Sequence, residues 1–202
     1  MNSALHSSTD KAVAILRKGG IVAFPTDTVY GIGVDPFQPE AVKKLYKIKG
    51  RPKDKPIPIL VGTGNDVETI SQHLPPVFNQ LVNQFWPGAL TLIVEARHLS
   101  PEITAGGKTV GVRMPNHPLA LELLRCFGGP IATTSANKSG EAPAISSQEV
   151  RDRLGNLVEL VLEQTEAFTK VSSTVIDVAV SPPKVRRQGD ITEDTLMQFL
   201  KK

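Results

Sequence analysis

The most informative group of reactive side chains is a short cationic segment, residues 47–55, which reads Lys-Ile-Lys-Gly-Arg-Pro-Lys-Asp-Lys. It places five cations and one carboxylate within nine residues, although the whole chain of 202 residues has a net charge of only +3. Gly50 and Pro52 prevent the segment from forming one continuous helix face. We therefore expect a loop that holds an anion, with a solubilising surface loop as the alternative.

Three further polar segments follow or border predicted strands. They are residues 25–33 (Pro-Thr-Asp-Thr-Val-Tyr-Gly-Ile-Gly), residues 133–140 (Thr-Thr-Ser-Ala-Asn-Lys-Ser-Gly), and residues 172–174 together with 186–189. Hydroxyls, an amide and exposed backbone N–H groups suit a polar substrate, a phosphate or the edge of a nucleotide. Turns with side-chain caps and ordinary Ser/Asn-rich loops are the alternatives.

Arg113 is a cation within an otherwise apolar predicted strand, residues 109–114. Strand alternation places it on the face opposite Val112. An arginine in this setting needs a carboxylate or phosphate partner, because a buried unpaired charge is costly. The pattern predicts an anion contact, and a structural salt bridge is the alternative.

Several familiar kinds of reactive site are excluded. Residues 106–109 (Gly-Gly-Lys-Thr) resemble the end of a phosphate-binding Walker A loop, but Glu102 stands at the first required glycine. The four histidines lack metal-ligand spacing, and Cys126 as the only cysteine cannot build a zinc site. We expect no metal site and no Gly-x-Ser-x-Gly nucleophile. Cys126 lies in an apolar pattern, which predicts a small buried residue.

Composition is typical of a soluble globular protein, with 40% hydrophobic and 21% charged residues. Residues 1–6 show no secretory signal, and no apolar run approaches the roughly 18 residues that a membrane span needs. A single cysteine excludes an internal disulfide and fits a reducing compartment. We expect a cytoplasmic protein with one domain over residues 1–202.

Helices and strands alternate along the whole sequence. Asp10 is a predicted helix cap, Pro58 marks a strand with a free edge or a bulge, and Trp86 is a predicted core aromatic. Helices are predicted over residues 10–18, 39–49, 77–85, from 118, 146–154 and from 192, and strands over residues 21–24, 57–61, 89–95, 109–114, 130–134, 158–162 and 174–180. This mixture predicts an α/β or α+β fold on a twisted, mixed sheet with ligands at strand ends.

Six segments in order resemble the YrdC/Sua5-like family of threonylcarbamoyl-AMP synthases, in its short single-domain form. They are Pro-Thr-Asp-Thr-Val-Tyr-Gly (25–31), Lys-Gly-Arg-Pro (49–52), Phe-Trp-Pro-Gly (85–88), Val-Gly-Val-Arg-Met-Pro (110–115), Ser-Ala-Asn (135–137) and Ser-Thr-Val-Ile-Asp (173–177). The resemblance implies a YrdC-like twisted sheet flanked by helices, with a concave basic ligand cavity. It also implies a core of about residues 10–190 and a C-terminal helix over 192–202.

The resemblance implies a reaction in which L-threonine, bicarbonate or CO₂, and ATP give threonylcarbamoyl-AMP and pyrophosphate. That product feeds the threonylcarbamoyl modification of the adenosine beside the anticodon of tRNA. The implied partners are ATP carrying Mg²⁺, L-threonine, bicarbonate, downstream threonylcarbamoyl-transferase proteins, and tRNA or double-stranded RNA.

Residue roles are carried over position by position from the same resemblance. The residues implied for threonine and its carbamate are Thr28, Arg113, Thr133 and Ser173, with Arg113 on the carboxylate. Those implied for the nucleotide are Arg51, Lys55, Thr109, Ser135, Asn137 and Arg187. Lys49 and Arg51 are the implied catalytic residues, which offset the charge of the triphosphate and of the leaving pyrophosphate.

The sequence departs from the family pattern at Asp27, Leu60, Pro143 and Gln188. At Leu60, a histidine that some members use near threonine is replaced. Two alternatives to the synthase are a paralogue of the same fold with another substrate and a binder of double-stranded RNA or tRNA. Residues 51–58 form a candidate lid over the cavity.

Overall fold

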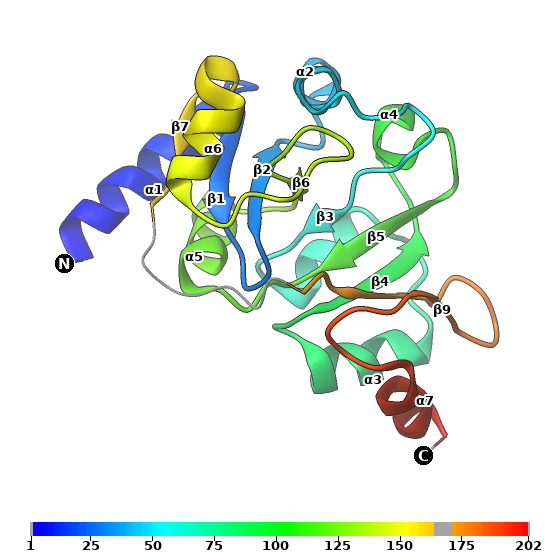
Figure 1. Ribbon diagram of the computed structural model, residues 1–202. Coiled ribbons are helices and arrows are strands. Elements are labelled where there is room, and N and C mark those ends of the chain that lie inside the picture. The colour runs from blue at the N-terminus through cyan, green and yellow to red at the C-terminus, as the bar shows by residue number, and fades with distance from the viewer. Residues whose placement is uncertain (1, 164–170, 202) are drawn as a thin grey trace.

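A computed structural model describes residues 2–163 and 171–201 as helices and loops around a large sheet (Figure 1). The nine strands of this sheet are ordered β7-β1-β2-β6-β3-β5-β4-β8-β9, with both parallel and antiparallel pairs. The predicted mixed sheet flanked by helices is therefore confirmed. The strands are β1 Val22–Pro25, β2 Tyr30–Val34, β3 Ile59–Leu60, β4 Leu90–Glu95, β5 Thr109–Arg113, β6 Ile131–Ser135, β7 Leu160–Val161, β8 Thr174–Asp177 and β9 Lys184–Arg187.

The helices lie on both faces of the sheet and along its ends (Figure 1). They are α1 Asn2–Arg17, α2 Pro39–Lys49, α3 Pro76–Phe85, α4 Pro101–Thr104, α5 Pro118–Phe127, α6 Ser147–Leu154 and α7 Glu193–Leu200, with short 3₁₀ turns at Gly64–Thr69 and Gly155–Leu157. Within the described ranges, no helix has the length and apolar character needed to cross a membrane.

The core consists of two apolar clusters, one on each face of the sheet. Side chains such as Ile59, Leu92 and Val112 point to one face and join the larger cluster with α2 and α3. On the opposite face, Val22 and Phe24 pack against α1 and α5 in a smaller cluster. Because α1 and α5 cover only the β1 side of this second face, its remaining part is available for a site.

Several predicted helix ends are confirmed, and local backbone geometry and capping hydrogen bonds explain them. The helix α2 begins with Pro39 and ends at Gly50, whose φ of 57° is the left-handed conformation that glycine adopts easily. The C-terminal helix α7 is capped by Thr192, whose hydroxyl accepts from the backbone N–H of Thr195. Trp86 is buried as predicted, and its indole N–H donates to Leu90 O at 2.8 Å.

The structure differs from the sequence predictions at four places. The first helix extends back to Asn2, so that Asp10 is internal rather than a cap. The strand β2 was not predicted, although it includes the second half of the polar segment of residues 25–33. Of the two alternatives for Pro58, the free edge is excluded, since β3 lies between β6 and β5 and Pro58 O accepts from Thr133 N. Cys126 is exposed, because α5 turns Leu123 and Leu124 to the core instead.

Candidate functional site

A cavity of about 350 Å³ crosses the part of the second sheet face that α1 and α5 leave uncovered. Its size is within the usual range for small-molecule sites. On this face the apolar residues of the β1 side give way to hydroxyls and arginines. The lining residues are Thr26, Thr28, Val29, Tyr30, Gly31, Arg51, Pro58, Leu60, Thr91, Arg113, Thr133, Thr134, Ser135, Pro143, Ser172, Ser173 and Arg187.

Two glycines allow neighbouring chain segments to approach each other closely at and beside the cavity. A Cβ atom on Gly31 would lie 2.7 Å from the methyl group of Thr133, which is shorter than real Cβ contacts. Gly189 is closer still to the chain at Ser172 and Ser173, where a Cβ would lie 2.1 Å from a carbonyl oxygen. These positions therefore admit only glycine, and they hold the hydroxyl-bearing segments against one another.

Three hydrogen bonds hold Arg113 at one side of the cavity. It ends β5, and its Nη2 donates to the carboxylate of Asp27 at 2.6 Å. Its Nε donates to Gly88 O at 2.9 Å, and its Nη1 donates to the Thr28 hydroxyl at 3.3 Å. Burial lowers the pKa of Arg113 from its ordinary value, and Asp27 opposes that shift. The guanidinium is thus fixed in place, with N–H groups beyond these three bonds.

The sequence predicted that Arg113 contacts an anion, with a structural salt bridge as the alternative, and the structure is compatible with both. Asp27 supplies a structural ion pair, and both side chains are largely buried. The pair leaves Arg113 among the residues that line the cavity. A planar guanidinium held in this way can grip a carboxylate with parallel hydrogen bonds.

Hydroxyl groups form one wall beside Arg113. Thr91 on β4 and Ser173 before β8 share a buried hydrogen bond of 2.8 Å between their side-chain oxygens. Arg187 of β9 donates to Ser173 O at 2.8 Å and to the Ser173 hydroxyl at 3.3 Å. Burial lowers the pKa of Arg187 from its ordinary value. This wall brings a second cation to the cavity.

Lys49 lies behind the cavity and not on its surface. Its ammonium donates to Ser135 O at 2.6 Å, to the Ser135 hydroxyl at 3.0 Å and to the side-chain oxygen of Asn137. Burial, and next the charge of Arg51, lower the pKa of Lys49 to about 8, while Glu141 opposes this change. Lys49 therefore fixes the end of β6, where Ser135 faces the cavity.

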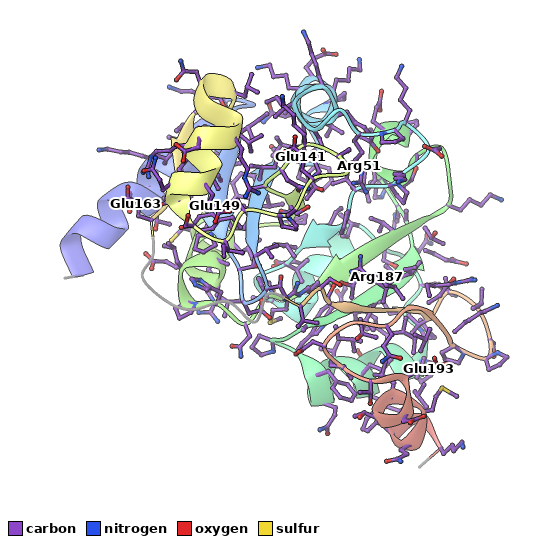
Figure 2. All side chains as sticks on the ribbon, viewed as in Figure 1. Arg51, Glu141, Glu149, Glu163, Arg187 and Glu193 are labelled. Carbon is purple, nitrogen blue, oxygen red and sulfur yellow. The ribbon has the colours of Figure 1, made fainter. Side chains whose placement is uncertain are left out.

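Arg51 stands on the other side of the opening, in the loop after α2. Its Nε donates to Lys55 O at 3.1 Å and its Nη2 donates to Pro56 O at 2.7 Å. Tyr46 links this loop to the rest of the fold, because its hydroxyl lies 2.7 Å from Lys55 O and 2.8 Å from Glu102 O. Figure 2 shows Arg51 and Arg187, which come from distant parts of the chain, above and below the level of β3 and β5.

The cationic segment is therefore divided between several environments. Lys49 is buried, and Arg51 lines the cavity. Lys55 is exposed and contributes its carbonyl oxygen to the loop. Lys47 and Lys53 line a separate hollow of about 740 Å³ between α2 and α4, in which Arg51 also takes part.

Seven residues singled out from the sequence line the cavity together: Thr28, Arg51, Arg113, Thr133, Ser135, Ser173 and Arg187. Lys49 and Asn137 form its second layer, at the end of β6. Lys55 and Thr109 do not line it, since Thr109 begins β5 at the end opposite Arg113. The nucleotide contacts of these two residues stay a prediction.

Sequence reasoning missed Thr91 as a lining residue, whereas Thr26 belongs to the predicted polar segment of residues 25–33. Thr91 is the single hydroxyl in the apolar strand of residues 89–95 and shares the face of Arg113, which was the available signal. No group of three or more metal-ligating side chains occurs in the described ranges.

Comparison with known proteins identifies the family to which this chain belongs. A model of the Sua5/YciO/YrdC family, described as telomere recombination, matches residues 14–189. This chain belongs to the Sua5/YciO/YrdC family.

Individual relatives share most of this chain. A threonylcarbamoyl-AMP synthase of Bacillus subtilis is 40% identical over 188 residues, which are 92% of this chain and 54% of that protein. The Cellvibrio japonicus protein of the same name is 35% identical, over 78% of this chain and 84% of its own length. The structure of Pyrococcus abyssi Sua5 complexed with L-threonine matches with a TM-score of 0.91 and 35% identity, over 95% of this chain and 57% of that one. The chain thus spans about half the length of the Bacillus subtilis and Pyrococcus abyssi proteins.

Proposed function

We propose that this chain is an L-threonylcarbamoyladenylate synthase, an enzyme of the nucleotidyltransferase class. It joins L-threonine and bicarbonate or CO₂ to the adenylyl group of ATP and releases pyrophosphate. The observation that carries this proposal is the cavity itself, in which a fixed arginine and a wall of hydroxyls meet two further arginines. The names of the relatives support the same activity.

The threonine end of the cavity is proposed to be the region around Arg113. Arg113 takes the carboxylate, because its guanidinium is already oriented by Asp27 and Gly88. Thr28, Thr133 and Ser173 surround this point and take the amine and the carbamate formed on it. The threonine bound in Pyrococcus abyssi Sua5 supports a threonine site in this fold.

The nucleotide end is proposed to be the region between Arg51, Ser135 and Arg187. Arg51 and Arg187 approach the cavity from two sides and can hold phosphate oxygens with charge-assisted hydrogen bonds. Lys49 fixes Ser135 and Asn137 and adds positive charge near the same place. The cavity lining contains no carboxylate, so Mg²⁺ enters with ATP as part of the substrate.

The chemistry follows from these positions. An oxygen of the threonine carbamate attacks the α-phosphorus of ATP, a P–O bond forms, and the bond to the pyrophosphate oxygen breaks. The nucleophile belongs to the substrate, so the protein acts by positioning and by stabilising charge. Arg51 and Lys49 are placed to offset the charge that develops on the leaving pyrophosphate.

The product is a reactive mixed anhydride and must be consumed by a transfer reaction. We propose that downstream threonylcarbamoyl-transferase proteins pass the group to the adenosine beside the tRNA anticodon. We propose the cytoplasm as the location of this reaction.

The activity is tested by incubating the protein with MgATP, labelled bicarbonate and L-threonine. The expected result is pyrophosphate release that depends on threonine, with label in an AMP adduct. Matched reactions with D-threonine, or without bicarbonate, should release no pyrophosphate above background. The absence of the adduct, under conditions in which the Bacillus subtilis enzyme forms it, would contradict the proposal.

A further inference from the structure

Three cavity side chains form a row across neighbouring strands at one level of the sheet, and Ser173 lies next to one end of this row. Leu60 on β3 pairs with Arg113 on β5. Because Leu92 pairs with Val112 in the next ladder, Thr91 on β4 lies opposite Arg113 on its other side. On the other side of Thr91 the paired residue of β8 is Val175, and Ser173 lies two residues before it. Leu60, Arg113, Thr91 and Ser173 are all buried and line the cavity. Arg113 is therefore flanked by one apolar side chain and one hydroxyl.

The orientation of Thr91 is fixed by its neighbours. A Cβ atom on Gly111 would lie 3.1 Å from the methyl group of Thr91, so this methyl packs over the glycine. The hydroxyl of Thr91 lies instead 2.8 Å from the Ser173 hydroxyl. The side chain thus presents its polar atom along the row, within the cavity.

The hydrogen-bond chain leaves Thr91 able to bind a ligand. Arg187 donates to the Ser173 hydroxyl, which can in turn donate its single proton to Thr91. The proton of Thr91 is then available to the cavity. By contrast, the Thr133 hydroxyl donates to Ile131 O, and the Thr28 hydroxyl contacts both Thr26 and Arg113.

We infer that Leu60 and Thr91 select the side chain of the amino-acid substrate, on the basis of the function proposed above. With the substrate carboxylate on Arg113, the Thr91 hydroxyl hydrogen-bonds the β-hydroxyl and Leu60 contacts the γ-methyl. Threonine alone among the common amino acids carries both groups on Cβ. The two flanks of Arg113 therefore reject serine, which lacks the methyl, and valine, which lacks the hydroxyl.

The inference is tested by calorimetric titration of L-threonine, L-serine and L-valine into the wild-type protein, Thr91→Val and Leu60→Ala. We expect Thr91→Val to weaken threonine binding about tenfold while valine binding does not weaken, because only the hydroxyl contact is lost. We expect Leu60→Ala to reduce the preference for threonine over serine about tenfold, because the methyl loses its apolar partner.

Control variants separate this role from a structural one. Thr91→Ser keeps the hydroxyl and should keep the preference for threonine over valine. Thr104→Val removes a buried hydroxyl on α4, outside the cavity lining, and should leave every affinity unchanged. A purely structural Thr91 would lower the melting temperature and weaken all three ligands equally.

Unchanged threonine-to-valine and threonine-to-serine preferences in Thr91→Val and Leu60→Ala would overturn the inference while leaving the synthase intact. If Thr91→Val does not fold, the ratio of threonine affinity to serine affinity in Leu60→Ala tests the inference alone. A wild-type protein that binds no threonine would instead overturn the proposed function, and the inference with it.

Discussion

The two ends of the cavity are built in different ways. At the threonine end, Arg113 is held inside the sheet by a carboxylate, a carbonyl and a hydroxyl from other segments. At the nucleotide end, Arg51 lies on a loop whose own carbonyls accept its hydrogen bonds. The first arrangement is set by the fold, whereas the second can change with the loop. Under the proposed function, this difference corresponds to a preformed amino-acid site beside a phosphate site whose arginine depends on the loop.

The largest effect is expected from Arg113→Ala. Threonine affinity should fall about 100-fold, because a desolvated guanidinium that grips a carboxylate is removed. The folded state should also lose about 3 to 5 kcal/mol, because the variant leaves a buried Asp27 carboxylate without this cation. Calorimetry and denaturant unfolding measure the two losses. In the Asp27→Ala/Arg113→Ala double variant, stability should partly recover while threonine affinity does not.

Lys49→Ala should lower kcat about 100-fold, in the range found for lost electrostatic stabilisers. Threonine affinity should change less than about threefold, because Lys49 bonds to Ser135 and Asn137 and not to the Arg113 region. Steady-state kinetics and threonine titration give the two values. A variant that loses threonine affinity and keeps its turnover would show that the two ends are not separate.

Arg51→Ala should lower kcat/KM for ATP about tenfold, with part of the loss in kcat, because one charge-assisted hydrogen bond to the phosphates and to the leaving pyrophosphate is removed. Lys53→Ala is the matched control on the same loop, since Lys53 is exposed and outside the cavity lining. Its kinetics should stay within about twofold of wild type. Equal effects of the two variants would indicate a diffuse electrostatic field and not a specific contact.

The pH dependence should be the smallest effect. The pKa of Lys49 is lowered to about 8, and the neutral amine cannot donate to all three of its acceptors. Turnover should therefore decline above pH 8. Since the folded pKa lies below the ordinary value of 10.5, the contribution of Lys49 to stability should rise over the same range.

Rate and melting profiles of wild type and Lys49→Arg measure these opposite trends. Arginine remains charged in this range, so the variant should lack the decline in turnover between pH 8 and 9. An identical decline in both proteins would assign it to another group.

The position of Arg113 could be predicted from the sequence because it rests on strand alternation, whereas Thr28, Thr133 and Ser173 were assigned only through the family resemblance. Arg113 alternates with Val112, and this pattern alone places it on the face opposite the main core. The strand β2 was not predicted, because Gly31 and Gly33 interrupt any pattern of alternating side chains there. Those glycines face Thr133 and Ile131 on a neighbouring strand, a contact that no local pattern reveals.

The nucleotide end was less predictable because it depends on contacts between distant residues. The spacing of the cations does not show that Lys49 is buried and Lys55 exposed. That difference follows from the bonds of Lys49 to Ser135 and Asn137 and from the link between Tyr46 and Glu102. The prediction that Cys126 is buried was wrong for a related reason, since the buried face of α5 consists of four other apolar residues.

The most direct test of the contrast between the two ends is the titration of L-threonine into the protein without nucleotide. A preformed site around Arg113 predicts saturable binding of one threonine per chain, with little change in affinity when Arg51 is replaced by alanine. Threonine binding that occurs only after ATP is added would contradict the account.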